Sequence, residues 1–144
     1  MLIGEYRHTL DPKKRVSLPS KFRKELGKKV IISKGFDNCL FVLDPKRWEA
    51  LVGKLANAPL GQRDGRDLSR FILAGAVETD VDAAGRILLP DHLKDHASLN
   101  EQVVVMGVST RVEIWSEEVW DTYSVAVAKQ ADQIAERYGE LGMI

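Results

Sequence analysis

The sequence contains a single cysteine, Cys39, so no disulfide can form within the chain. A lone thiol in an apolar stretch, with no histidine nearby in the sequence, is more typical of a small buried residue than of a nucleophile. No apolar run approaches the roughly 18 residues that a membrane-spanning helix requires. Residues 1–10 also lack the hydrophobic core of a signal peptide. These absences favour a cytoplasmic protein with no membrane partner.

The chain also lacks net charge, because 21 basic residues balance 21 acidic ones, but the two halves differ. Residues 1–72 carry 16 basic and 8 acidic side chains, whereas residues 73–144 carry 5 and 13. This asymmetry predicts a polyanion-binding site on the first half. It would also bring oppositely charged faces of neighbouring subunits together in an assembly.

One sequence pattern occurs twice. Residues 10–19 read LDPKKRVSLP and residues 81–90 read VDAAGRILLP, so an Asp, three residues, an Arg, a short apolar alternation and Leu-Pro recur. The match continues from Gly35 and Gly107 to Trp48 and Trp120. Self-similarity at a long fixed spacing indicates repeated structural units.

Within each unit the pattern predicts a strand, a loop, a strand, a helix, two strands and a helix. The apolar alternation before each Leu-Pro predicts a half-buried strand. Pro19 and Pro90, followed by Ser20 and Asp91, predict capped helix starts. Further strands are expected at 30–33, 39–43, 103–106 and 111–115, and helices from 45, over 63–74 and over 117–139.

Neither unit is large enough to bury a core alone. We therefore expect an α+β fold in which two units, residues 5–47 and 76–119, interlock into one pseudo-twofold domain, followed by a C-terminal helix over 120–144. In that helix Trp120, Val127, Ile134 and Leu141 recur every seven residues. This row either packs against the chain's own domain, which we favour, or contacts another subunit.

The doubled D-x-x-x-R motif, in DPKKRVSLPSKFR and DAAGRILLPDHLK, resembles the MraZ family of bacterial transcriptional regulators, as do GEYRHTLD, GAVETDVD and VEIWSEEVW. The resemblance covers nearly the whole chain and implies two SpoVT-AbrB units whose swapped hairpins form one β-barrel with peripheral helices. It also implies ring-shaped homo-oligomers, octamers or dodecamers, that bind double-stranded DNA at repeated promoter sites. Such a regulator would control division and cell-wall genes and associate with the nucleoid.

The first copy departs from the family pattern at one position. Glycine usually precedes the motif arginine, as Gly85 does, whereas the first copy has Lys14 there. If that backbone position has a positive φ, lysine costs more than glycine. The first loop would then differ in shape while it gains a cation.

Nine basic side chains lie between residues 7 and 29, opposed only by Asp11 and Glu25. Such cations release counterions from DNA phosphates, and arginine can also hold a guanine edge through two hydrogen bonds. A merely solvated surface is the alternative interpretation. The second copy has only Arg86 and Lys94 in the matching span, so the fold itself does not require the lysines. The DNA-binding candidates are Arg7, Lys13, Lys14, Arg15, Lys21, Arg23 and Arg86.

Asp11 and Asp82 begin the two motifs, although a carboxylate near DNA repels phosphate. We expect them to structure the loops, by accepting hydrogen bonds from loop amides or by orienting the arginine. The alternative is an exposed ion pair worth about 0–1 kcal/mol. Because lysines precede Arg15 and small residues precede Arg86, we expect Arg15 to contribute more to DNA binding, and Arg86 mainly to hold its own loop.

Residues 92–96, HLKDH, resemble the H-x-x-E-H zinc motif, but the matching residues 21–25 of the first copy read as an ordinary surface helix. The sequence has no phosphate-binding glycine loop and no catalytic constellation. We therefore expect no enzymatic activity, no metal and no cofactor. The leading hypothesis is an oligomeric DNA-binding regulator. The alternative is an antitoxin-like protein-interaction module, without enzymatic activity, that uses the C-terminal helix.

Overall fold

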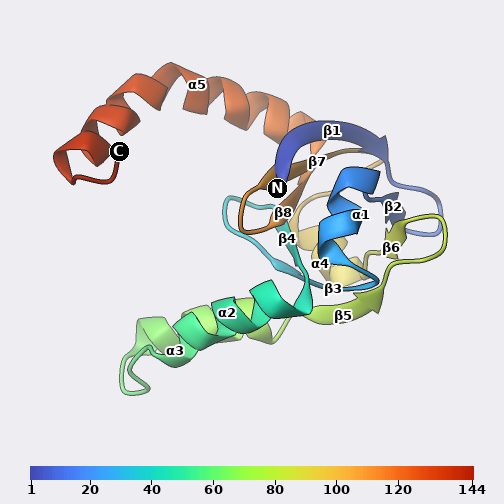
Figure 1. Ribbon diagram of the computed structural model, residues 1–144, viewed down its shortest axis with the longest axis horizontal. Helices are drawn as coiled ribbons and strands as arrows, with labels where there is room; N and C mark the ends of the chain where they lie inside the picture. The colour runs from blue at the N-terminus through green and yellow to red at the C-terminus, as the bar shows by residue number, and fades with distance from the viewer.

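The computed structural model describes residues 1–144 and contains the strands and helices in the expected order (Figure 1). The strands are β1 (Ile3–Thr9), β2 (Arg15–Ser17), β3 (Lys29–Lys34), β4 (Leu40–Leu43), β5 (Val77–Asp80), β6 (Arg86–Leu88), β7 (Gln102–Val108) and β8 (Val112–Ser116). The helices are α1 (Ser20–Leu26), α2 (Pro45–Ala56), α3 (Arg63–Leu73), α4 (Asp91–His96) and α5 (Glu117–Glu140). The order of elements repeats between the units, with α3 as the addition to the first.

The two units are joined strand by strand. The main antiparallel sheet has the order β1-β7-β8-β4-β3-β5, while β2 and β6 pair in a separate two-stranded ribbon. In the main sheet β1 of the first unit pairs with β7 of the second, and β5 of the second pairs with β3 of the first. Exchanging the units leaves this pattern unchanged. The interlocked α+β architecture is therefore confirmed, whereas closure into a barrel stays a prediction because β1 and β5 are the edges of the sheet.

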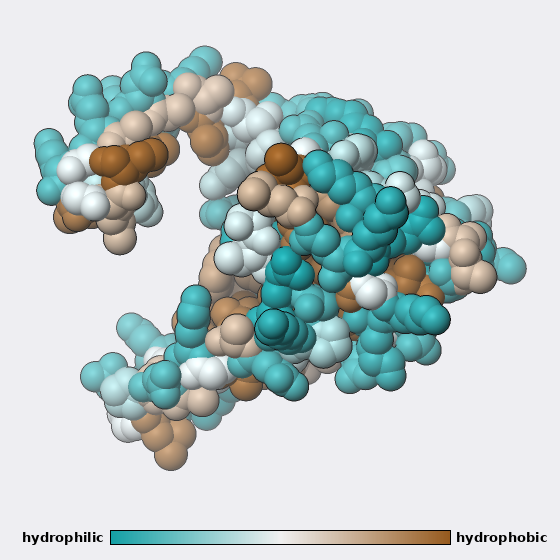
Figure 2. All heavy atoms as spheres, viewed as in Figure 1, coloured by the Kyte–Doolittle hydropathy of each residue, from teal (hydrophilic) through white to brown (hydrophobic).

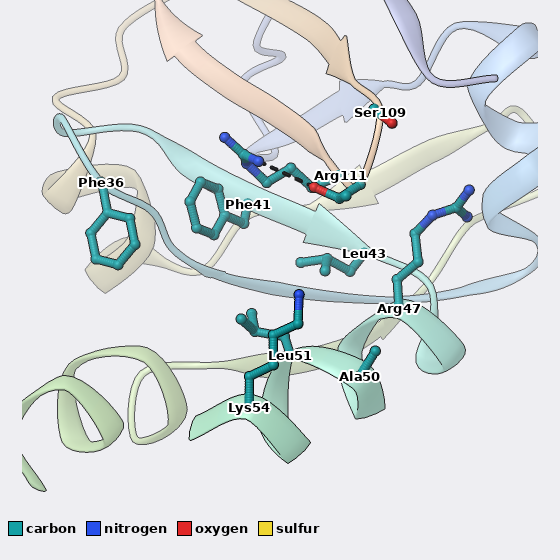
Figure 3. Close-up of a pocket in the computed structure, with 10 residues that line it drawn as sticks. Phe36, Phe41, Leu43, Arg47, Ala50, Leu51, Lys54, Ser109 and Arg111 are labelled. Carbon is teal, nitrogen blue, oxygen red and sulfur yellow. Dashed lines mark hydrogen bonds between the residues drawn. The ribbon is translucent and has the colours of Figure 1, made fainter. Parts of the chain in front are cut away.

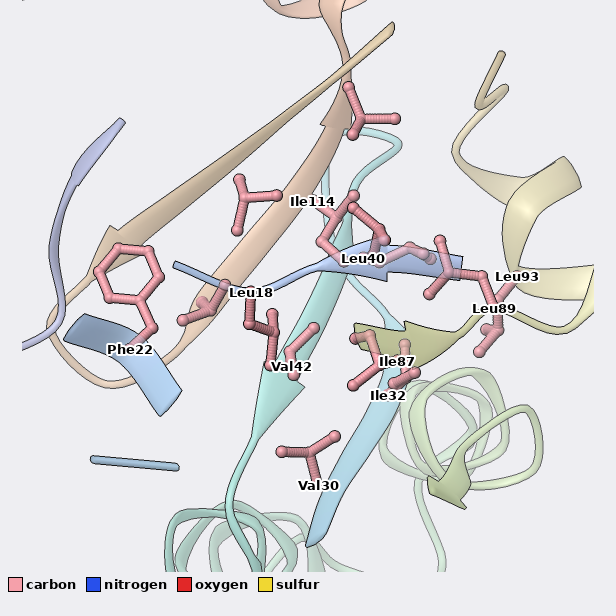
Figure 4. Packing of buried hydrophobic residues seen from close by; sticks show 14 of the residues in the cluster. Leu18, Phe22, Val30, Ile32, Leu40, Val42, Ile87, Leu89, Leu93 and Ile114 are labelled. Carbon is pink, nitrogen blue, oxygen red and sulfur yellow. The ribbon is translucent and has the colours of Figure 1, made fainter. Parts of the chain in front are cut away.

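Both units contribute to one main core. A cluster of 19 buried residues includes Leu18 and Phe22 from the first unit and Leu89 and Leu93 from the second (Figure 4). Each unit has an apolar face that only the other unit covers. Burying these faces together is the main favourable contribution to the fold, at about 25 cal/mol per Å² of apolar surface.

The two short helices begin without the side-chain caps that the sequence suggested. Pro19 and Pro90 occupy the N-cap positions of α1 and α4, and neither helix has a side-chain capping bond. The expectation for Ser20 and Asp91 was therefore wrong, since both already lie inside the first turn. By contrast, Ser116 caps α5 as expected and accepts a hydrogen bond from the Val119 N–H at 3.5 Å.

Two helical arms project from the β-sheet on the same side of the molecule, α2 with α3 forming one and α5 the other (Figure 1). The first turns of α5 pack on Trp115, whose ring centroid is 5.0 Å from those of both Trp120 and Tyr123. Farther along, Val127 is 40% exposed and Leu141 is 72% exposed. Trp120, the first residue of the heptad row, therefore packs against the chain's own domain as we favoured, whereas for Val127 and Leu141 that expectation was wrong. No helix in the structure combines the length and the apolar character needed to cross a membrane.

Two glycines provide a test of how closely the units interlock. A Cβ at Gly107 of β7 would lie 2.6 Å from the backbone nitrogen of Ile3, the residue at which β1 of the other unit begins. A Cβ at Gly53 of α2 would meet no atom within 4 Å. We expect Gly107→Ala to lower the free energy of unfolding by about 1–3 kcal/mol because the backbones must separate. Gly53→Ala should raise it by up to about 1 kcal/mol because alanine favours the helix. Denaturant titrations of both variants measure the difference, and equal effects would contradict the close approach of β1 to β7.

Candidate nucleic-acid interface

The two D-x-x-x-R segments form loops beside the β2–β6 ribbon, at the end of the molecule opposite the helical arms (Figure 1). The first loop (residues 11–15) connects β1 to β2, and the second loop (residues 82–86) connects β5 to β6. Val16 pairs with Ile87 in the ribbon, and both are fully buried. Since side chains alternate along a strand, Arg15 and Arg86 lie on the opposite, outer face. They occupy a diagonal pair of positions, for which the typical separation is about 7–8 Å.

Each loop holds its arginine in the same way. Asp11 Oδ1 accepts a hydrogen bond from the backbone N–H of Arg15 at 2.8 Å, and Oδ2 accepts one from the Arg15 Nε at 2.8 Å. In the second loop Asp82 accepts the same two bonds from Arg86, at 2.8 and 2.9 Å. The Nη atoms of both arginines have no partner within the chain. Each carboxylate therefore fixes one edge of a guanidinium and leaves the other edge available to a ligand.

These hydrogen bonds also set the charge of the loops. The backbone N–H of Arg15 is the main cause that lowers the pKa of Asp11 below its ordinary value, and the Arg15 side chain adds to it against the opposing effect of desolvation. The pKa of Asp82 is lowered in the same way by Arg86. Both carboxylates therefore remain ionised at neutral pH and keep their acceptor oxygens.

The backbone at the tip of each loop is left-handed, with φ of 61° at Lys14 and 82° at Gly85. Each of these residues also accepts a hydrogen bond across the ribbon, the Lys14 carbonyl from the Leu89 N–H and the Gly85 carbonyl from the Leu18 N–H. The two loops therefore share one shape, and the expectation that Lys14 alters the first loop was wrong. The Lys14 Nζ lies 2.5 Å from Asp91 at the start of α4, and this contact lowers the pKa of Asp91.

The second loop receives a cation from the first unit. Arg23 of α1 crosses Gly85 so closely that a Cβ at residue 85 would collide with its guanidinium. The Arg23 Nε is buried there without a hydrogen-bond partner, and the side chain forms no ion pair within the chain. The sequence contains the signal for this arrangement, a glycine in the second loop and an arginine in the first unit. Their proximity follows only from the exchange of elements between units.

The structure separates Arg7 from the other candidates. Its guanidinium lies 2.9 Å from Asp121, 3.1 Å from Glu5 and 3.4 Å from Glu117, so carboxylates of β1 and α5 surround it. The hydrogen bond to Asp121 is the main cause that raises the pKa of Arg7. Lys21 reaches the Ile3 carbonyl at 3.4 Å. The structure thus brings Arg15, Arg86, Lys13, Lys14 and Arg23 to the two loops, and it places Arg7 near the first turns of α5.

The two histidines of the zinc-like motif point to different partners. His92 Nε2 lies 2.8 Å from the Gly75 carbonyl, and His96 Nε2 lies 3.3 Å from the Gly35 carbonyl. Cys39 is fully buried, and burial raises the pKa of its thiol. These side chains therefore serve the packing between elements in this structure.

The causes of the lowered pKa values can be tested by an NMR titration of the carboxyl carbons. Asp11 and Asp82 should both titrate below ordinary aspartate. Because their folded pKa values are lowered, they stabilise the fold above the pKa of unfolded aspartate, and this contribution is lost as the pH falls through the folded values. In Arg15→Ala the pKa of Asp11 should rise only part of the way, since the backbone N–H remains, and that of Asp82 should not change. Full recovery of the ordinary value would mean that the side chain alone holds the carboxylate.

Comparison with known proteins agrees with this arrangement of two loops on two units. The family described as "MraZ protein, putative antitoxin-like" matches residues 1–71 and again residues 72–139. A relative from Caldanaerobacter subterraneus subsp. tengcongensis, named Transcriptional regulator MraZ, is 52% identical over 94% of this chain and 95% of its own. Relatives of the same name from Thermoanaerobacter sp. and Caldicellulosiruptor saccharolyticus are 49% and 50% identical over 99% of this chain and 100% of their own. This chain therefore belongs to the MraZ family.

Proposed function

We propose that this chain is a DNA-binding transcriptional regulator that contacts duplex DNA through the outer face of the β2–β6 ribbon. One observation carries the proposal: Arg15 and Arg86 are each fixed by an aspartate on that face, with their Nη atoms free. A two-stranded ribbon fits the major groove, where a guanidinium can bind the O6 and N7 atoms of guanine. The names of the curated relatives support the same class of function.

The remaining cations divide into two groups around this face. Lys13 is exposed and free of partners at the tip of the first loop, and Arg23 supplies a guanidinium beside the second. We assign these two residues, together with Lys14 and Lys21, to phosphate contacts, which position a protein without reading sequence. Arg7 is left out of the proposed surface because three carboxylates already neutralise it.

The assembly and the targets belong to the same proposal. We infer that the units at residues 5–47 and 76–119 form one closed barrel, that residues 120–144 form a separate helical arm, and that the chain assembles into a ring. The unequal charge of the two halves supports attraction between neighbouring subunits. By resemblance to the family, the ring would bind repeated promoter sites of division and cell-wall genes in the cytoplasm, at the nucleoid.

Replacing each motif arginine tests the ribbon surface. The structure gives the two arginines the same geometry and gives the second loop a cation, so we now expect both Arg15→Ala and Arg86→Ala to weaken specific binding. Removing one pair of arginine–guanine hydrogen bonds should cost about 1–3 kcal/mol per bound subunit. The measurement is a gel-shift titration on operator and scrambled DNA.

Two controls accompany that titration. Arg7→Ala should have little effect, and Lys13→Ala should weaken binding to both DNAs alike. Light scattering checks that each variant assembles as the unaltered chain does. Unchanged binding by Arg86→Ala would restrict DNA reading to the first loop, and unchanged binding by both arginine variants would overturn the proposed surface.

Salt dependence separates the DNA-binding function from the antitoxin-like alternative. The projecting helix α5 favours that alternative, because an exposed helix can engage a protein partner. Binding of DNA should weaken with a logarithmic slope of about −0.9 per phosphate neutralised. Several subunits with two or three phosphate contacts each should give a slope steeper than about −5. Fluorescence anisotropy over a salt series measures this slope. A flat response would favour the protein-interaction module.

A further inference from the structure

Arg23 of α1 is the one half-buried arginine whose side chain has no partner in the structure. Six arginines are half-buried, and five of them donate a side-chain hydrogen bond within the chain: Arg15, Arg47, Arg66, Arg86 and Arg111. Arg47 and Arg111, for example, line a cavity between α2 and β4 (Figure 3), and carboxylates pair with both. Arg23 donates no such bond and forms no ion pair. A buried polar group of this kind in a folded protein requires an explanation.

The guanidinium of Arg23 is held in place without a ligand from its own chain. Its Nε is buried, whereas its two Nη atoms form no hydrogen bond and are open to solvent. Asp82, the carboxylate of the second loop, is paired with Arg86 and not with Arg23. Figure 2 shows mostly hydrophilic residues over α1, beside the end of the molecule that carries the loops. Arg23 therefore keeps its charge for an anion outside the chain.

The place of this guanidinium depends on a missing side chain. Gly85 is buried beneath Arg23. A Cβ at residue 85 would lie 2.5 Å from the Cζ atom of Arg23 and closer still to its Nη1. Atoms cannot approach so closely, so any side chain at this position would displace the guanidinium from the tip of the second loop.

The backbone conformation alone does not explain the glycine. The left-handed conformation strains residues other than glycine, yet the first loop accommodates Lys14 at φ 61°, close to the 82° of Gly85. The two loops differ in what lies at their tips. Lys14 provides its own cation, which binds Asp91, whereas Arg23 crosses Gly85. The space that Arg23 occupies is therefore the feature that distinguishes position 85.

We propose that Arg23 and Gly85 together form a phosphate-binding site at the tip of the second loop. Arg23 supplies the cation, because the exposed tip residues Ala83 and Ala84 have no side-chain donor. Gly85 is a positioning residue that keeps the guanidinium across the tip. The ligand is a backbone phosphate of duplex DNA, which a guanidinium can hold through two hydrogen bonds, next to the base contacted by Arg86. The inference rests on the proposed DNA-binding function and names the origin of the second loop's phosphate contact.

A cycle of single and double variants tests whether the two residues act as one site. Arg23→Ala should weaken binding to operator and scrambled DNA alike, by about tenfold, because a phosphate contact carries no sequence information. Gly85→Ala should cause the same loss by displacing the guanidinium. The variant with both changes should lose no more than Arg23→Ala does. Fluorescence anisotropy titrations measure these affinities, and a salt series with Arg23→Ala should show a slope shallower by about 1 per bound chain.

Gly85→Lys gives a sharper result, since it copies the residue of the first loop. A cation added to a DNA-binding surface ordinarily strengthens binding. As a single change Gly85→Lys should instead weaken binding, because the lysine side chain expels Arg23. In the Arg23→Ala variant the same change should strengthen binding, because the lysine then supplies the missing cation. A loop whose backbone was disrupted by the new residue would show no such rescue.

Two controls match the charge and the backbone conformation of these variants. Arg63→Ala removes an exposed, unpaired arginine of α3, at the end of the molecule away from the loops, and should leave the affinity unchanged. Lys14→Ala places alanine in the left-handed conformation of the first loop, so its loss and that of Arg23→Ala should multiply when combined. Circular dichroism and light scattering check that every variant folds and assembles as the unaltered chain does.

Three results would overturn the inference: unchanged DNA binding by Arg23→Ala, losses of Arg23→Ala and Gly85→Ala that multiply, or stronger binding by Gly85→Lys alone. The NMR signal of the Arg23 Nε–H is read without DNA and so separates the inference from the proposed function. This buried N–H should exchange slowly with water in the unaltered chain and rapidly in Gly85→Ala. Slow exchange in Gly85→Ala would reject the positioning role alone. Failure of the unaltered chain to bind DNA would reject the regulator and the phosphate contact together.

Discussion

The burial of each unit's apolar face against the other unit is the constraint on which this structure depends. Val16 and Ile87 meet across the β2–β6 ribbon with no exposed surface, and β1 and β5 complete the sheet of the opposite unit. A single unit would leave this surface in water, and domains of that size bury too little to remain folded alone. The fold is therefore one cooperative body made from two similar sequences, and its pseudo-twofold symmetry follows from the repeat.

This interlocking also creates the proposed DNA surface. Because the inner face of the ribbon is committed to the core, its alternate residues must face outward, and Arg15 and Arg86 occupy those positions. The exchange of elements then places each short helix over the loop of the other unit, α1 over the second loop and α4 over the first. Arg23 of α1 adds a cation beside Gly85 in the second loop. Asp91 of α4 forms an ion pair with Lys14 in the first loop. The second loop consequently gains a cation that its own stretch of sequence lacks, while one lysine of the first loop is paired with a carboxylate.

The proposed DNA surface and the helical arms lie at opposite ends of the molecule (Figure 1). The loops and the ribbon occupy one end, and α2, α3 and α5 project from the other. The carboxylates around Arg7 lie where β1 meets α5, so this cation helps to attach the acidic arm to the domain.

The sequence by itself determined the local elements, the repeat and the two motif arginines. Alternation of apolar residues, β-branched runs and proline positions depend on neighbours in the chain, and the spacing of each Asp and Arg within one loop is also local. Only the tertiary structure decided which cations gather at the loops, because Arg23 meets Gly85 and Lys14 meets Asp91 across the two units. It also decided that α5 leaves the domain, since a heptad row shows that a helix has an apolar face but not which surface covers it. Contacts between residues distant in sequence depend on how the units exchange their elements, and that arrangement is settled by the burial of the whole core.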